Sequence, residues 1–145
     1  MKISLNKTVS YDVADVELLS VNISKVMDGS LLFAVPFRWL DSEAVEIRRT
    51  VNRYPQAVLE AVMGGTTDAQ NLMTAFASLF TVGERPMVII RSGVNNLSVL
   101  AIHREDVEGE KKTIIKRYTE NELMDHGLSL SVLNSIIGQV ASALT

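Results

Sequence analysis

The sequence contains no cysteine, and it has only two histidines and three prolines among its 145 residues. The absence of cysteine excludes disulfides, thiol nucleophiles, iron–sulfur clusters and every zinc site that needs a thiolate ligand. The eight glycines form neither a phosphate-binding loop nor a dinucleotide-binding motif. We therefore expect no cofactor and no metal ion, and the sequence favours a protein that is not an enzyme.

Long apolar runs are also absent. The N-terminal residues lack the continuous apolar stretch of a signal peptide, so we expect a cytoplasmic protein that makes no contact with a membrane. The net charge of −3 argues against a protein that coats nucleic acid through bulk charge. The chain does have 47% hydrophobic residues, so we expect a single domain over residues 1–145 with a hydrophobic core.

Alternating apolar and polar residues predict strands in the first part of the chain, over residues 1–6, 19–24 and 31–39. Asp28-Gly29 predicts the hairpin turn between the second and third strands, because glycine adopts positive φ without steric cost. Pro36 has no N–H to donate to a neighbouring strand. We therefore expect the third strand to be an edge strand, or to be bulged, at this residue.

Helical spacing replaces the alternation after residue 40. Asp41 is a good N-cap for a first helix over residues 41–54, and the apolar stripe of this helix would consist of Ala44, Ile47, Val51 and Tyr54. Because Pro55 breaks this helix, we expect a second helix over residues 55–63 and a third over residues 67–80.

The second part of the chain repeats this succession of strands and helices. Strands are expected over residues 87–91, 97–104 and 112–118, as an antiparallel meander. Thr119 and Glu122 have the spacing of a capping box that begins a short helix. A last helix is expected over residues 129–144.

Together these elements predict an α+β fold in the order βββ-ααα-βββ-αα, with an antiparallel sheet of up to six strands and helices packed on one face. The two halves, residues 1–83 and 84–145, suggest an internal duplication, in which Trp39-Leu40-Asp41 corresponds to Tyr118-Thr119-Glu120. Turn and cap residues recur by convergence, so two similar supersecondary units without common origin are the alternative.

Charge is also scarce, and its distribution is informative. Only 21% of the residues are charged, and the deficit is local: residues 61–83 carry a single charge, on Asp68, and residues 126–145 carry none. The remaining 102 residues carry 30 charges, which is an ordinary share for a soluble surface. The deficit therefore falls on two of the predicted helices.

Small uncharged residues lie opposite the apolar stripes of these two helices, where Lys, Arg and Glu are usual. They are Ser131, Ser135, Gly138 and Ser142 on the last helix and Thr74, Ala77 and Ser78 on the third. Small side chains let helix backbones approach closely, and a surface without charge costs little to desolvate. Three interpretations compete, apart from coincidence. The helices pack against each other within one molecule, they form the interface of a homo-oligomer or of a complex with another protein, or they associate with a membrane, which the polar groups of the last helix disfavour.

Nucleic-acid binding is an alternative function. Lys112, Lys116, Arg117 and Tyr118 are close together on one predicted strand, and a sheet face with basic side chains and a stacking ring can hold single strands. The alternation of the strand puts Arg117 on the face opposite to the other three, and the interleaved aromatic residues of a strong stacking platform are absent.

A small enzyme or ligand-binding module around His103 is the second alternative. His103 ends a predicted strand beside an acidic loop, which is the setting of a general base, although a histidine in such a place is usually solvated. His126 suits a helix C-terminus. Arg38 and Trp39 would serve as a binding anchor, unless Trp39 belongs to the core.

The leading hypothesis is a small, non-catalytic protein that works by protein–protein association, as a homodimer through the charge-poor helices. Such chains are common among adaptors, chaperone-like modules, inhibitors and components of phage or bacterial assemblies, and the sequence does not select among these.

Overall fold

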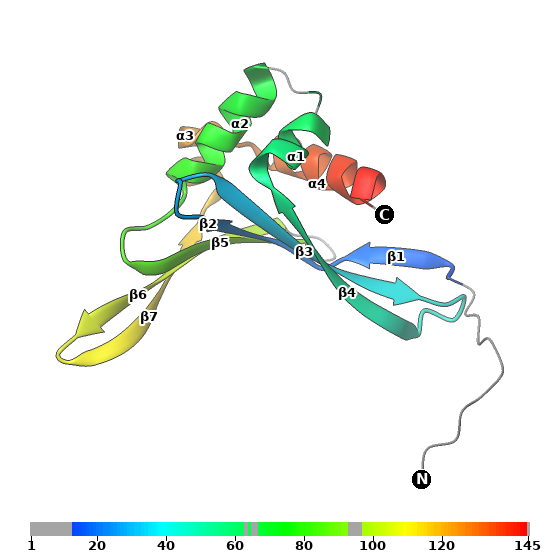
Figure 1. Cartoon of the computed structure of the whole chain (residues 1–145), viewed down its shortest axis with the longest axis horizontal. Coiled ribbons are helices and arrows are strands. Elements are labelled where there is room, and N and C mark those ends of the chain that lie inside the picture. The colour runs from blue at the N-terminus through cyan, green and yellow to red at the C-terminus, as the bar shows by residue number, and fades with distance from the viewer. Residues whose placement is uncertain (1–12, 63, 65–66, 93–96, 145) are drawn as a thin grey trace, which may run out of the picture.

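The computed structural model describes residues 13–62, 64, 67–92 and 97–144. It has the predicted α+β fold, in which an antiparallel sheet carries helices on one face (Figure 1). The described residues form seven strands and four helices in the order ββββ-αα-βββ-αα, and two of the strands, at residues 15–18 and 46–55, were not predicted. The strand predicted over residues 1–6 and most of the turn after residue 91 lie outside the described residues. The proposed duplication of the two halves stays a prediction.

The first four strands are β1 (Asp15–Leu18), β2 (Ser20–Lys25), β3 (Leu31–Leu40) and β4 (Glu46–Pro55). The hairpin between β2 and β3 forms where it was predicted, and Gly29 has a φ of 87°. β4 pairs with β3 along nearly its whole length, so β1 and β2 share the other edge of β3 one after the other. The seven strands therefore occupy six positions across the sheet.

The prediction of an edge strand at Pro36 is wrong, because β3 is paired on both sides. The carbonyl of Pro36 accepts a hydrogen bond of 3.0 Å from the backbone N–H of Leu19, the residue that separates β1 from β2. The nitrogen and the carbonyl of one strand residue point to the same side. The nitrogen of Pro36 therefore points to the place where β1 ends and β2 begins. Because pairing is interrupted there, the lack of an N–H on Pro36 costs the sheet few hydrogen bonds.

The helix predicted over residues 41–54 is also wrong, because this segment is the β3–β4 turn followed by β4. The carboxylate of Asp41 accepts hydrogen bonds from the backbone N–H groups of Glu43 and Val45, both at 2.9 Å. An aspartate that caps a turn uses the same chemistry as one that caps a helix, so the signal at Asp41 was ambiguous. Pairing with β3, together with β-branched residues such as Ile47 and Val51, favours the strand.

The remaining elements agree with the predicted order. They are α1 (Gln56–Val62), α2 (Thr67–Ser78), β5 (Glu84–Ser92), β6 (Leu97–Val107), β7 (Glu110–Tyr118), α3 (Glu120–Asp125) and α4 (Leu130–Leu144). The capping box at the start of α3 is confirmed: the Thr119 hydroxyl accepts from the backbone N–H of Glu122, and the Glu122 carboxylate accepts from the backbone N–H of Thr119. β5, β6 and β7 form the predicted meander.

The core lies between the sheet and the helical layer. Phe33 of β3 meets Phe76 of α2 edge to face, with the ring centroids 6.2 Å apart, and Leu133 of α4 is completely buried. Among the described residues no helix lies on the opposite face of the sheet, so that face is uncovered (Figure 1). The molecule thus has two large surfaces to examine, namely the outer side of the helices and the uncovered side of the sheet.

Candidate interaction surface

The small residues of α4 face away from the core. Ser131, Ser135 and Gly138 are exposed, and a Cβ atom placed on Gly138 would meet no other atom within 4 Å. The buried Leu133 and the half-buried Ile136 lie on the side that faces the sheet. The fourth predicted residue, Ser142, lies in α4, but its side chain is outside the described residues.

The corresponding residues of α2 divide between the surface and the core. Thr74 and Ser78 are exposed, whereas Ala77 is half-buried and packs against the core. The Thr74 hydroxyl donates to the Gln70 carbonyl at 3.1 Å, and the Ser78 hydroxyl lies 2.6 Å from the Ala75 carbonyl. These two hydroxyls bond to carbonyls of their own helix, whereas Gln70 and Asn71 are also exposed on α2 and uncharged.

The two helices do meet inside the molecule, but through their apolar stripes. Met73 and Phe76 of α2 and Leu133, Ile136 and Ile137 of α4 surround the same small space beneath the helices. The small residues take no part in this contact, apart from Ala77. Packing within one molecule therefore does not explain why these faces lack charge.

A hollow of about 570 Å³ joins the outer surfaces of α2 and α4. Thr74 and Ser78 line it from α2, and His126 and Val132 line it from the side of α3 and α4. His126 is the C-cap of α3, as its sequence position predicted, and its Nδ1 lies 2.8 Å from the Ser78 hydroxyl. This contact ties α2 to α3, so the outer helical surface is continuous across the hollow.

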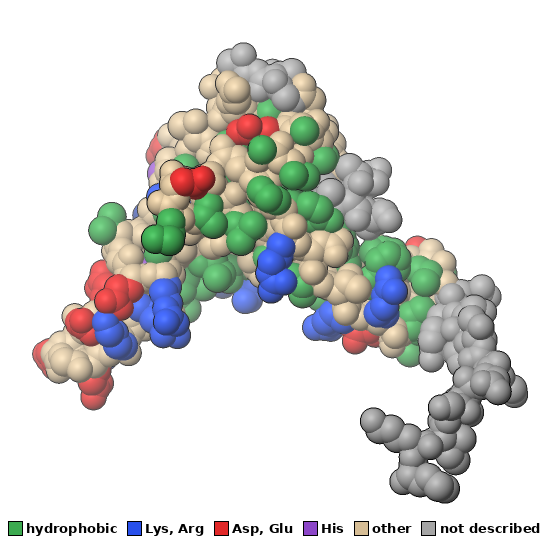
Figure 2. All heavy atoms as spheres, viewed as in Figure 1, with side chains coloured by type: hydrophobic (Ala, Val, Ile, Leu, Met, Phe, Trp, Pro, Cys, Tyr) green, Lys and Arg blue, Asp and Glu red, His purple; other side chains and the backbone are tan. Residues whose placement is uncertain are grey.

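α1 adds to this surface, and sequence reasoning did not find it. Ala57, Val58 and Ala61 are exposed on α1, and its single acidic residue, Glu60, is half-buried and accepts a hydrogen bond of 2.9 Å from Gln56. The short element had no charge deficit of its own to mark it. In Figure 2 the Lys and Arg side chains lie mainly along the sheet, below the helical layer.

The basic cluster predicted on β7 is not gathered on one surface. Register puts Lys112, Lys116 and Tyr118 on the helical side of the sheet and Arg117 on the uncovered side. The Tyr118 ring is 8% exposed, and its hydroxyl donates to the carbonyl of Leu79. Lys116 lies over that ring and pairs with Glu122 at 3.2 Å. Tyr118 is therefore a core residue, and its ring is not available for stacking on a base.

The local environment shifts the pKa of two of these groups. Burial raises the pKa of the Tyr118 hydroxyl above its ordinary value. The hydrogen bond from Lys116, together with the bonds from Thr119, lowers the pKa of the Glu122 carboxyl. Lys116 and Glu122 thus form an exposed ion pair that connects β7 to the start of α3.

His103 is buried, at 5% exposure, and is not solvated as its place at a strand end suggested. Its Nδ1 lies 2.6 Å from the Thr81 hydroxyl, and its Nε2 lies 2.7 Å from the Glu105 carboxylate. Gly83 packs directly against the ring. Because both nitrogens are occupied by protein partners, the ring connects β6 to the loop before β5 and has no free nitrogen for a ligand.

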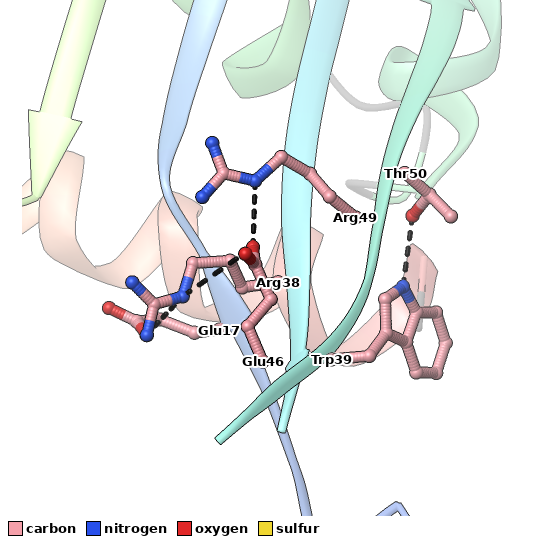
Figure 3. Close-up of polar contacts among 6 residues, drawn as sticks. All are labelled: Glu17, Arg38, Trp39, Glu46, Arg49 and Thr50. Carbon is pink, nitrogen blue, oxygen red and sulfur yellow. Dashed lines mark hydrogen bonds and ion pairs between the residues drawn. The ribbon is translucent and has the colours of Figure 1, made fainter. Parts of the chain in front are cut away.

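Arg38 and Trp39 point to opposite faces of β3 (Figure 3). The Arg38 Nε lies 3.6 Å from Glu17 and 4.0 Å from Glu46, which is within ion-pair range but too far for a hydrogen bond. The Trp39 indole donates to the Thr50 hydroxyl at 3.0 Å, and Arg48 lies over the ring. Trp39 is half-buried, so it is neither a core residue nor a free anchor.

The described residues hold no group of three or more His, Asp or Glu side chains arranged to bind a metal ion. Within the same part of the chain, no helix is long and apolar enough to cross a membrane. Fold and surface together define an α+β domain with a single helical layer, in which the described outer side chains of α2 and α4 are uncharged. No family model, curated protein or solved structure matches the chain.

Proposed function

We propose that the protein works by protein–protein association and forms a homodimer through the outer face of α2 and α4. One observation carries the proposal: all described side chains of these two helices are uncharged, although many of them are exposed, including Gln70, Thr74, Ser131 and Asn134. An exposed helical face normally carries Lys, Arg and Glu, which keep it in water. A face of Ser, Gly, Asn and Gln is instead easily desolvated, and it still offers hydrogen bonds to a partner.

A second copy of the chain is the partner that this surface suits. A two-fold interface brings the same patch of both molecules together, so charges of one sign on the patch would repel each other. The described side chains of α2 and α4 carry no such charge, and among the described residues that line the hollow between them the only acidic one is Asp125 of α3. Gly138 has open space around its Cα, which permits a helix of the second copy to approach closely.

The experiment is light scattering after gel filtration over a range of micromolar concentrations. We expect twice the chain mass of 16.0 kDa, with dissociation on dilution. Gly138→Lys and, separately, Ser131→Lys should give folded monomers, because each places an unpaired charge in the interface. Val45→Lys is the matched control, since Val45 is 53% exposed in the β3–β4 turn, away from the helices.

Two results would overturn the proposal. One is a wild-type chain that is monomeric at every concentration, and the other is a dimer that persists in both lysine variants. Circular dichroism separates loss of association from loss of folding, and the second variant keeps the test valid if one of the two does not fold.

The nucleic-acid alternative has less support, since the Tyr118 ring is buried and Lys116 is paired with Glu122. It requires affinity for a polyanion that falls steeply with salt and with charge reversal at Lys112.

A further inference from the structure

Arginines collect on the uncovered face of the sheet. Residues directly opposite each other in an antiparallel ladder share a face, so the register assigns six of the eight arginines to this side. They are Arg38, Arg49, Arg53, Arg91, Arg104 and Arg117. They come from five different strands, so no segment of the sequence shows them as a cluster.

Four of these arginines form no ion pair with the described residues, and one of the four, Arg104, lies opposite Glu84 in the β5–β6 ladder. Arg38 and Arg49 are compensated at one end of the sheet by Glu17 and Glu46, with Arg49 and Glu46 only 2.8 Å apart. In contrast, Arg53, Arg91 and Arg117 are exposed and form no ion pair with the described residues. The face therefore carries positive charge that no described side chain neutralises.

A largely aliphatic band lies between Arg53 and Arg117. One row of facing residues begins with Arg53 on β4 and ends with Arg117 on β7. Between them lie Ala34, the polar Asn22 of β2, Ile89 and Leu100, of which Leu100 is already buried. The row spans six strands, which is about 24 Å at ~4.8 Å per strand. In the next row, Met87 and Ile115 are 37% and 60% exposed.

The uncovered face is also concave. Figure 2 shows the underside of the molecule hollowed between two arms, with Lys and Arg side chains along it, and Figure 1 shows that the arms are the β6–β7 hairpin and the β3–β4 hairpin. A concave face with a largely apolar row about 24 Å long suits an α-helix of about 16 residues that lies along the row, with Arg53 and Arg117 near its ends and Arg91 beside it.

We propose that the uncovered face of the sheet binds an amphipathic helix of another protein, with its apolar stripe on the aliphatic band and its flanking Asp and Glu residues on Arg53, Arg91 and Arg117. Guanidinium groups pair with carboxylates in a bidentate geometry, and an apolar helical face buries the aliphatic side chains. The register places no aromatic side chain of the described strands on this face, so it has no stacking platform for a nucleic-acid strand.

A designed peptide tests this proposal by fluorescence anisotropy. The probe is a labelled 18-residue helix with Leu on one face and Glu on both flanks. Two control peptides replace Glu with Lys, or scramble the order so that no apolar face forms. We expect binding of the first peptide alone, and weaker binding at higher salt.

Two single substitutions on β7 give a matched pair of protein variants. Arg117→Glu should weaken binding of the acidic peptide about tenfold, as loss of one charge-assisted contact implies. Lys112→Glu makes the same charge change on the opposite face of the same strand, so it should leave the affinity unchanged. Arg53→Glu repeats the test at the far side of the band.

Several outcomes would overturn the proposal: no binding of the acidic peptide, equal binding of the scrambled peptide, or equal effects of Arg117→Glu and Lys112→Glu. Tighter binding of a labelled 20-nucleotide oligothymidine, lost in Arg117→Glu, would assign the face to nucleic acid instead. The test is independent of the proposed dimer, because Gly138→Lys should not alter peptide binding and Arg117→Glu should not alter the mass measured by light scattering.

Discussion

Gly83 is the position where the addition of one methyl group should be most informative. A Cβ atom there would lie 2.1 Å from Cδ2 of His103, 2.7 Å from its Cγ and 3.0 Å from the carbonyl oxygen of Arg104. Carbon atoms normally approach to about 3.5–4 Å, so the imidazole would have to move by more than ~1 Å. Such a movement breaks its hydrogen bonds to Thr81 and Glu105.

The expected loss of stability follows from these contacts. Two hydrogen bonds are each worth about 1 kcal/mol, and overpacking of a buried site adds about 1–3 kcal/mol. Alanine also lowers the conformational entropy of the unfolded chain, which offsets about 0.5–1 kcal/mol of the loss in stability. Gly83→Ala should therefore destabilise the fold by about 2–4 kcal/mol, which lowers the Tm by about 5–15 °C in a domain of this size.

Urea unfolding followed by the fluorescence of the single tryptophan, Trp39, measures this loss. Val82→Ala, at the neighbouring position, is the control, because Val82 is 93% exposed and a surface substitution of this kind changes stability little. In a His103→Ala background the Gly83→Ala change should cost much less, since the clashing ring is gone and only the contact of 3.0 Å with the Arg104 carbonyl remains. Full wild-type stability of Gly83→Ala, or a cost that is the same in both backgrounds, would refute this account of His103.

Two further predictions concern the junction of β7 and α3. Thr119→Ala removes the N-cap of α3 and should lower the free energy of unfolding by about 1 kcal/mol in chemical denaturation, whereas Asn121→Ala, exposed in the same helix, should not lower it. The pKa of Glu122 is lowered from its ordinary value of 4.5 by Lys116 and Thr119. The ionised carboxylate thus stabilises the fold above the unfolded pKa, and this contribution is lost as pH falls through the lower folded pKa. Glu122→Gln should therefore have a lower Tm than the wild type at about pH 7 and a smaller difference at about pH 3, and a difference that does not change with pH would contradict the pairing.

Local signals predicted most elements of the fold, and the reason is that they act over a few residues. Asp28-Gly29 needs only positive φ to form its turn, and Thr119 with Glu122 needs only four consecutive residues to form the capping box. The inward face of α2 and the meander were likewise visible from periodicity. β4 was missed because the residues after Asp41 fit helical spacing almost as well as alternation, and only pairing with β3 decides between them.

The candidate surfaces could likewise be predicted only in part, because exposure depends on how distant segments pack. The sequence located the charge deficit on two helices, yet it left open whether the small residues lie inside or outside. Exposure of Ser131, Ser135 and Gly138 answered that question, since the apolar stripes alone complete the core. His103 was misjudged because its partner Thr81 is 22 residues away and Gly83 leaves the space that its ring occupies.

By itself, then, the sequence determined the class of fold, the hairpin and cap positions, and the two helices that lack charge, because each of these depends on composition or on neighbouring residues. The tertiary structure alone decided which faces are exposed, and it brought Arg53, Arg91 and Arg117 from three strands to one side of the sheet. The physical reason is register: the side of a sheet on which a residue lies is defined only once its strand is paired, and in this chain the pairing joins segments far apart in the sequence.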